Sequence, residues 1–284
     1  MNTRQWQPIG IFDSGIGGLT VLRAIHQLMP GERLLYMADQ AHVPYGPRKL
    51  EEVRHFSETI TGFLIDQGAR LIVVACNAAS AAALRQLRTV FPHVPFVGME
   101  PAVKPAAEHT HSGVVGVLAT PATFQGELYA SVVERFGQRV KLLQHTCPGL
   151  VAQIEAGAFD TPETRRILEE ALHPMLRQGI DTVVLGCTHY PFVIPLIQNI
   201  VGPDVRVIDP APAVARQVQR LLVASDLLEL ETVMKEPAQP HHLNLLQIYT
   251  SGNPSTLEHL LPAVLGEIAP VQHLSWKAGK LVTV

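Results

Sequence analysis

Residues 71–80 read LIVVACNAAS, and this stretch guides the interpretation of the whole chain. Its first residues form an apolar run typical of a strand buried on both faces, and the small and polar residues after Cys76 favour the start of a helix. In helix-covered parallel sheets, ligands bind outside the carboxyl ends of the strands. The sequence therefore predicts that the thiol of Cys76 lies where an α/β protein binds its ligand.

A second cysteine stands in the same setting. Residues 183–191 read VVLGCTHYP, so Cys187 follows an apolar run and precedes Thr188 and His189. A free cysteine often acts as a small buried hydrophobe, but two in matching contexts favour function. Cys147, in TCPG, lacks that context, and we interpret it as structural. Since no CxxC or metal-ligand spacing occurs, we expect reduced thiols and no metal.

Short apolar runs alternate with longer amphipathic ones along the chain. This pattern predicts an α/β fold, with parallel-type sheets covered by helices on both faces. The expected strands are Ile9–Phe12, Leu34–Met37, Leu71–Ala75, Phe96–Gly98, Val114–Leu118, Val140–Leu143, Thr182–Leu185, Val205–Ile208 and a late run at 245–252, and the expected helices include Leu50–Gln67, Ala79–Val90 and Pro162–Gln178.

The chain also divides into two similar halves. Asp13 and Cys76 follow two strands of the first half, and Ala119 and Cys187 follow two strands of the second at a similar separation. We predict two pseudo-symmetric domains, residues 1–98 plus 209–284 and residues 99–208, with the active site in the cleft between them. The charged, then proline- and histidine-rich segment from 225 to 242 is interpreted as a surface excursion.

Two opposed thiols suit one kind of chemistry. A thiolate on one side removes a proton while a thiol on the other side delivers one, which inverts a carbon stereocentre without a cofactor. The ordinary cysteine pKa of about 8.5 must be tuned for this task. Helix N-termini lower such a pKa, and both cysteines precede apparent helix starts. His189 is placed to orient or protonate a thiol, with a packing histidine as the alternative.

Residues 13–20, DSGIGGLT, form a glycine-rich turn. The turn fails the dinucleotide fingerprint because Thr20 replaces the third glycine, and it lacks the Gly-Lys-Ser/Thr of a P-loop. We expect it to bind a small anion or ammonium group at a helix N-terminus, with Asp13 holding an amino group or assisting a thiol. Helix capping by Asp13 or Ser14 is an equal alternative.

Composition limits the class of partner. The chain has 284 residues, 47% of them hydrophobic, and a net charge of −3. It therefore lacks the basic character of nucleic-acid binders, and it has no basic cluster for a membrane surface. No apolar run approaches the roughly 20 residues that span a bilayer, and the first residues do not resemble a signal peptide. We expect a soluble, cytoplasmic protein that binds a small molecule, with no nucleic acid or membrane partner.

Five segments in order resemble the glutamate racemases: FDSGIGGLTV (12–21), PYG (44–46), ACNAAS (75–80), GVLAT (116–120) and LGCTHYP (185–191). Residues 250–252, TSG, extend the match toward the end of the chain. The resemblance implies a racemase that interconverts L- and D-glutamate without a cofactor and supplies D-glutamate for bacterial peptidoglycan. It also implies two α/β domains with the site between them. A homodimer is compatible with the sequence.

The resemblance also implies roles for single residues. Cys76 and Cys187 would be the acid/base thiols, assisted by Asp13 and His189. The residues expected to contact the substrate are Asp13, Ser14, Tyr45, Gly46, Asn77, Ala78, Thr188 and His189. Ala78 departs from the family, which has threonine there, so a backbone N–H remains but a hydroxyl is lost. We interpret this as a weakened or retuned racemase.

Three alternatives remain open at this point. The chain could be a racemase for aspartate or a broader range of amino acids, because specificity depends on pocket volume. It could be an amino-acid-binding homologue that has lost catalysis, with Ala78 as the first sign. It could also be a redox protein that forms a Cys76–Cys187 disulfide. A racemase exchanges the α-proton of its substrate with heavy water, and a binding protein does not.

Overall fold

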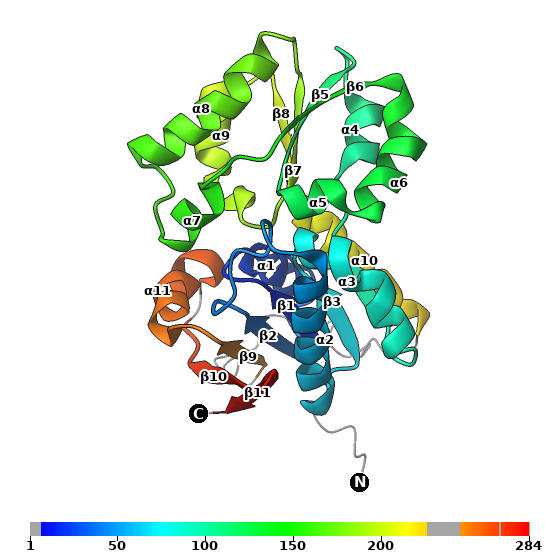
Figure 1. Cartoon of the computed structure of the whole chain (residues 1–284), viewed down its shortest axis with the longest axis vertical. Helices are drawn as coiled ribbons and strands as arrows, with labels where there is room; N and C mark the ends of the chain where they lie inside the picture. The colour runs from blue at the N-terminus through cyan, green and yellow to red at the C-terminus, as the bar shows by residue number, and fades with distance from the viewer. Residues whose placement is uncertain (1–6, 226–244, 267, 284) are drawn as a thin grey trace.

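The computed structural model describes residues 7–225, 245–266 and 268–283, and it has two lobes (Figure 1). Each lobe contains a sheet covered by helices, so the predicted α/β class is confirmed. The lower lobe in Figure 1 has seven strands in the order β11-β10-β9-β2-β1-β3-β4, and the upper lobe has four in the order β6-β5-β7-β8. The strands of the lower lobe are β1 Ile9–Asp13, β2 Leu34–Ala38, β3 Leu71–Val74, β4 Phe96–Gly98, β9 Leu246–Thr250, β10 Val271–Lys277 and β11 Lys280–Thr283. Those of the upper lobe are β5 Val114–Ala119, β6 Lys141–His145, β7 Thr182–Gly186 and β8 Arg206–Ile208.

The two sheets repeat one topology. The strand order β2-β1-β3-β4 matches β6-β5-β7-β8, and all these neighbours pair in parallel. The registers are similar, since Phe12 pairs with Val74 and Ala119 pairs with Gly186 near the carboxyl ends of the central pairs. The predicted pseudo-symmetry is therefore confirmed. Cys76 follows β3, the neighbour of β1, and Cys187 follows β7, the neighbour of β5.

The tail of the chain returns to the first sheet, as expected. Strand β9 pairs in parallel with β2, with Ile248 opposite Tyr36. Beyond β9, β10 pairs in parallel with it, and β11 closes the edge as an antiparallel neighbour; neither strand was predicted from the sequence. The boundaries given to the two domains stay a prediction. The excursion expected at 225–242 lies, apart from Ser225, outside the described residues.

Helices cover both faces of the sheets (Figure 1). The three predicted helices are confirmed to within two residues at each end, as α2, α3 and α8. The helices are α1 Leu19–Leu28, α2 Leu50–Asp66, α3 Asn77–Val90, α4 Val103–His109, α5 Pro121–Gln125, α6 Glu127–Phe136, α7 Leu150–Glu155, α8 Pro162–Leu176, α9 Ile194–Val201, α10 Ala211–Ala224 and α11 Pro254–Leu265, with 3₁₀ turns η1 Gly137–Arg139 and η2 Tyr190–Val193.

The core explains why the strands read as continuous apolar runs. Every residue of β1 is buried, and successive side chains point to opposite faces. Ile11 belongs to a cluster with Leu19 of α1, whereas Phe12 belongs to a cluster with Ile60 of α2. Since helices lie over both faces, neither face of the strand can be polar. In β1 the one polar residue, Asp13, is therefore the last residue of the strand, where the two lobes meet.

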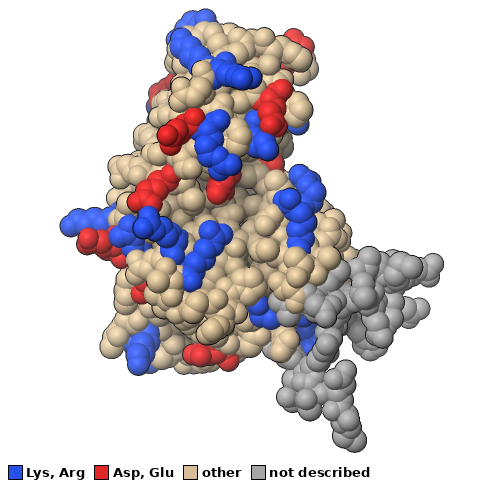
Figure 2. All heavy atoms as spheres, turned by 90° about the vertical axis from the view of Figure 1, so that its right-hand side faces the viewer, with Lys and Arg blue, Asp and Glu red and all other residues tan. Residues whose placement is uncertain are grey.

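The surface carries charges of both signs. Basic and acidic side chains are interspersed on the face shown in Figure 2. None of the helices within the described ranges is both long and apolar enough to cross a bilayer.

Candidate active site

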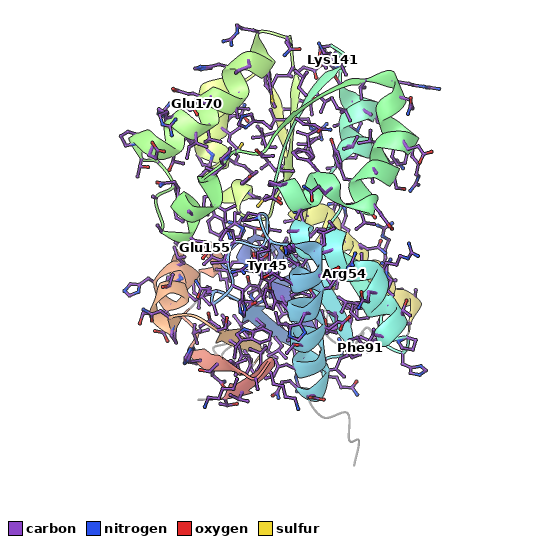
Figure 3. All side chains as sticks on the ribbon, viewed as in Figure 1. Tyr45, Arg54, Phe91, Lys141, Glu155 and Glu170 are labelled. Carbon is purple, nitrogen blue, oxygen red and sulfur yellow. The ribbon has the colours of Figure 1, made fainter. Side chains whose placement is uncertain are left out.

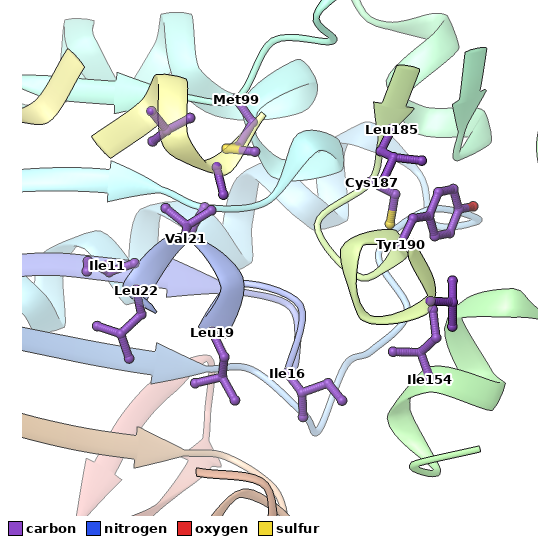
Figure 4. Packing of buried hydrophobic residues seen from close by; sticks show 14 of the residues in the cluster. Ile11, Ile16, Leu19, Val21, Leu22, Met99, Ile154, Leu185, Cys187 and Tyr190 are labelled. Carbon is purple, nitrogen blue, oxygen red and sulfur yellow. The ribbon is translucent and has the colours of Figure 1, made fainter. Parts of the chain in front are cut away.

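Cys76 and Cys187 line the same cavity, between the two lobes. Cys76 follows β3, and Cys187 follows β7 of the other lobe. Figure 4 shows Cys187 just beyond the strand that carries Leu185, beside the ring of Tyr190. Both cysteines are buried, with 4% and 6% of their surface exposed. The structure therefore brings together the two thiols that the sequence placed at matching strand ends.

The other residues of the cavity come from both lobes. Of the ten site residues expected from the sequence, only Asp13 is absent from the lining. Three lining residues, Pro44, Thr120 and Val151, were not expected. The lining comprises Ser14, Pro44, Tyr45, Gly46, Cys76, Asn77, Ala78, Thr120, Val151, Cys187, Thr188 and His189.

Asp13 lies behind the lining and joins the lobes. Its carboxylate is fully buried, and Oδ2 accepts hydrogen bonds from the backbone N–H groups of Gly15 (3.2 Å) and Gly18 (3.0 Å). Oδ1 accepts one from the hydroxyl of Thr188 in the other lobe at 3.3 Å. Burial raises the pKa of Asp13, while the charge of His189 opposes that rise. Asp13 thus lies behind the lining, where its charge acts on the thiol of Cys76 and its Oδ1 binds the hydroxyl of Thr188.

The glycine-rich turn is not open to a ligand anion. The N–H groups of Gly15 and Gly18 donate to Asp13, and the N–H of Ile16 donates to Oε1 of Glu155 at 2.8 Å. The prediction that this turn binds a small anion is therefore wrong for these three amides, because carboxylates of the chain already occupy them. The glycines allow close packing instead: a Cβ at Gly17 would come within 2.5 Å of Nδ1 of His189.

A buried His–Glu pair stands beside Cys187. Nδ1 of His189 lies 3.8 Å from Sγ of Cys187, and Nε2 lies 2.5 Å from Oε1 of Glu155. Burial lowers the pKa of His189, but the hydrogen bonds to Cys187 and Glu155 outweigh it and raise this pKa well above its usual value. Burial raises the pKa of Glu155, and its bonds to His189 and Ile16 overcome that effect and lower it. The pair is therefore imidazolium and carboxylate, and both ring N–H groups face acceptors.

Cys76 has a different environment. Its sulfur accepts a hydrogen bond from the N–H of Ala79 in the first turn of α3, at 3.5 Å, and lies 3.9 Å from Oγ of Ser14. Burial and the charge of Asp13 raise the pKa of Cys76 well above its usual value, although the bond from Ala79 opposes them. These effects favour the thiol form of Cys76, which can deliver a proton.

The expectation that both cysteines precede helix starts holds only for Cys76. After Cys187 the chain forms the 3₁₀ turn η2, and α9 begins at Ile194. Pro191 and Pro195 lack N–H groups, so the α-helical hydrogen-bond pattern cannot start directly after the strand. His189, rather than a helix N-terminus, is therefore the positive group beside Cys187.

Asn77 has the strongest unfulfilled demand for a ligand. The residue is 3% exposed and lines the cavity, yet neither its amide nitrogen nor its amide oxygen has a hydrogen-bond partner among the described residues. A buried amide without partners costs about 1–3 kcal/mol, which a polar ligand in the cavity would offset. Ala78, the next residue of α3, also lines the cavity and is 4% exposed.

Sequence reasoning missed two polar residues. Glu155 ends α7, an ordinary helix, and no local motif marks it; Figure 3 places it with Tyr45 at the junction of the lobes. Thr120 follows β5 as Ser14 follows β1, so the internal duplication was a signal that could have identified it. Its hydroxyl lies 3.1 Å from that of Thr123.

The remaining cysteine stays outside the site. Cys147 is 2% exposed and does not line the cavity, and burial raises its pKa to about 12. All three cysteines are free. Within the described ranges, no group of three or more His, Cys, Asp or Glu side chains is arranged to hold a metal ion.

Known proteins share this architecture. The Asp/Glu/Hydantoin racemase family model matches residues 9–218. The glutamate racemase of Ectopseudomonas mendocina (strain ymp) is 49% identical over 271 residues, which cover 95% of this chain and 99% of that protein. The crystal structure of glutamate racemase isoform RacE1 from Bacillus anthracis has a TM-score of 0.81 at 31% identity and covers 98% of this chain and 100% of that one. Glutamate racemase of Francisella tularensis, solved in complex with D-glutamate, has a TM-score of 0.79 at 29% identity, with 95% and 97% covered. The chain therefore belongs to the Asp/Glu/Hydantoin racemase family, and it is an amino-acid racemase.

Proposed function

We propose that this protein interconverts L- and D-glutamate through two cysteine bases, Cys76 and Cys187, without a cofactor. The observation that carries the proposal is the pair of strand-end thiols, one from each pseudo-symmetric sheet, in a single buried cavity. The names of the relatives support glutamate as the substrate, and the D-glutamate complex of the Francisella tularensis racemase shows that ligand bound in a protein of similar fold.

The proposed reaction needs one thiolate and one thiol at a time. The thiolate takes the α-proton of glutamate, and the electron pair of the broken C–H bond delocalises into the carboxylate. The opposite thiol then delivers its proton to the other face of the α-carbon and becomes a thiolate. Configuration is inverted, atoms and charge balance, and the reverse reaction exchanges the roles of the two sulfurs.

Residues around the thiols would stabilise the charged intermediate. The unpartnered amide of Asn77 and the N-terminus of α3 suit the substrate carboxylate, whose negative charge grows when the α-proton leaves. The imidazolium of His189 directs an N–H group toward Cys187, so it can lend or hold a proton there. Asp13 accepts a hydrogen bond from Thr188, and its negative charge disfavours the thiolate form of Cys76.

The size of the cavity does not decide between glutamate and aspartate. Its volume is about 20 Å³, and aspartate, one methylene shorter than glutamate, remains the rival substrate. One methylene is worth only about 1–3 kcal/mol of discrimination between the two substrates.

We also propose that the first domain comprises residues 1–98 and 209–284 and the second residues 99–208. From the resemblance, we propose that the product D-glutamate serves bacterial peptidoglycan.

Racemisation by the purified protein tests the proposal. D-glutamate, L-glutamate and both aspartate enantiomers are each incubated without added cofactor and followed by chiral chromatography. We expect each glutamate enantiomer to reach an equal mixture of the two, with aspartate slower by about tenfold or more. Conversion of neither amino acid, despite binding of glutamate in calorimetry, would identify a binding protein instead.

A further inference from the structure

Asp39 is a buried carboxylate that does not line the cavity, yet four side chains bind it. The residue follows β2 and is fully buried. Its oxygens accept hydrogen bonds from the hydroxyls of Tyr45 and Ser251 (both 2.6 Å), the indole N–H of Trp276 (2.7 Å) and Nδ1 of His42 (2.9 Å). Hydrogen bonds to a buried charge are stronger than neutral ones, so this cluster holds its members firmly.

The members of the cluster come from distant parts of the chain. Ser251 follows β9 and Trp276 belongs to β10, both beyond the second lobe in sequence. The two donate to Oδ1 of Asp39, whereas Tyr45 donates to Oδ2. The ring of His42 stacks on Phe56 at 4.0 Å and meets the edge of Trp276 at 4.9 Å. Aromatic packing therefore aims the indole N–H at the carboxylate.

Tyr45 connects this cluster to the cavity. It lines the cavity with its neighbours Pro44 and Gly46, and it is 1% exposed. On the far side, the carbonyl of Gly46 accepts a hydrogen bond from the N–H of Ala122 in the other lobe at 3.1 Å. A Cβ at Gly46 would come within 2.7 Å of Cβ of Thr120, so the loop is wedged between Asp39 and the second lobe.

We infer that Trp276, acting through Asp39, is a positioning residue that fixes the 44–46 loop against the substrate. The inference rests on the proposed function, because it assigns a task within the same site to a strand that never touches the cavity. Loss of the indole N–H leaves Oδ1 with Ser251 and the weaker contact of His42 at 3.2 Å. The carboxylate can then rotate, and the hydroxyl of Tyr45 loses its fixed acceptor.

Trp276→Phe tests this positioning role, because phenylalanine keeps an aromatic ring beside His42 and removes the indole N–H that binds Asp39. Tyr249→Phe is the matched control. Tyr249 is an aromatic residue of β9, 7% exposed, that packs on Phe63 at 5.2 Å, and within the described residues it is not one of the side chains that bind Asp39. We expect Trp276→Phe to raise the KM for glutamate about three- to tenfold while kcat stays within about twofold, since loop contacts act equally on ground and transition states. Tyr249→Phe should change neither.

Two further measurements distinguish a positioning role of Trp276 from a general effect on the stability of the fold. In a Tyr45→Phe background, Trp276→Phe should raise KM by less than about twofold, because Asp39 then has no hydroxyl at position 45 to hold. In hydrogen exchange, amides of the 41–48 segment should exchange about fivefold faster in Trp276→Phe and at the parental rate in Tyr249→Phe. Equal KM effects in both backgrounds, or unchanged loop exchange, would overturn the inference.

The outcomes also separate this inference from the proposed function. If the parent racemises glutamate and Trp276→Phe has an unchanged KM, the proposed function is supported and the positioning role of Trp276 is contradicted. A parent that does not racemise glutamate would remove the function, and the exchange rates of the loop would still show whether Trp276 anchors it.

Discussion

Nε2 of His189 lies 2.5 Å from Oε1 of Glu155, and that same oxygen accepts the N–H of Ile16 from the other lobe at 2.8 Å. One carboxylate thus raises the pKa of the histidine beside Cys187 and ties the two lobes together. The arrangement makes Glu155, a residue without any local sequence signal, a positioning group for the proposed proton transfer.

The first prediction concerns catalysis by the Glu155→Gln variant. Glutamine keeps an oxygen for His189 and Ile16 but removes the charge that raises the pKa of His189. We expect kcat to fall about ten- to a hundredfold and the alkaline limb of the pH–rate profile to move to lower pH. Glu127→Gln, at an exposed ion pair with Arg85, is the control and should keep the parental profile. An unshifted limb would mean that Glu155 does not control the histidine.

The same pair predicts how stability depends on pH. The lowered pKa of Glu155 gives a contribution that is complete above its ordinary value of 4.5 and is lost as pH falls through the folded pKa. The raised pKa of His189 gives a contribution that is complete below its ordinary value of 6.5 and is lost as pH rises through the folded pKa. The difference in unfolding free energy between parent and Glu155→Gln should therefore be greatest between pH 4.5 and 6.5 in urea titrations. A difference that is constant from pH 4 to 9 would contradict the ion pair.

A third prediction concerns Ala78, where the resemblance to the glutamate racemases implies a threonine. Ala78→Thr should raise kcat/KM about ten- to a hundredfold, because a hydroxyl at this lining position can bind the substrate carboxylate as its charge grows. Ala78→Val is the matched control, since valine has the shape of threonine without the hydroxyl. Steady-state kinetics in both directions decide the matter. If threonine is no faster than alanine, position 78 does not contact the substrate.

A fourth prediction uses two glycines with opposite surroundings. A Cβ at Gly15 would overlap Oε1 of Glu155, whereas a Cβ at Gly62, within α2, meets no atom within 4 Å. Gly15→Ala should lower kcat/KM at least about tenfold by displacing Glu155. Gly62→Ala should leave activity unchanged and raise the unfolding free energy by about 0.5–1 kcal/mol, the ordinary gain of alanine over glycine in a helix. Parental activity in Gly15→Ala would show that the position of Glu155 is unimportant.

Sequence reasoning reached the fold and most of the cavity because both depend on local patterns. Buried strands that end in a cysteine located both thiols, and motif order located Tyr45 and Asn77. Strands β10 and β11 were missed because their partly exposed residues show no continuous apolar run. Glu155 was missed because its role arises only when α7 of one lobe meets the glycine turn of the other. The prediction that a helix starts directly after Cys187 was wrong, because Pro191 and Pro195 delay the first α-helical turn.

The two-thiol mechanism is tested most directly by α-deuteration in heavy water with Cys76→Ala, Cys187→Ala and Cys147→Ala. Either of the first two variants should lose racemisation, because one base cannot reach both faces of the α-carbon. Any deuterium that a single remaining thiolate incorporates should enter one enantiomer only, and the two variants should label opposite enantiomers. Cys147→Ala, outside the cavity, should racemise and label both enantiomers as the parent does. Racemisation at the parental rate by Cys76→Ala or Cys187→Ala would contradict the mechanism.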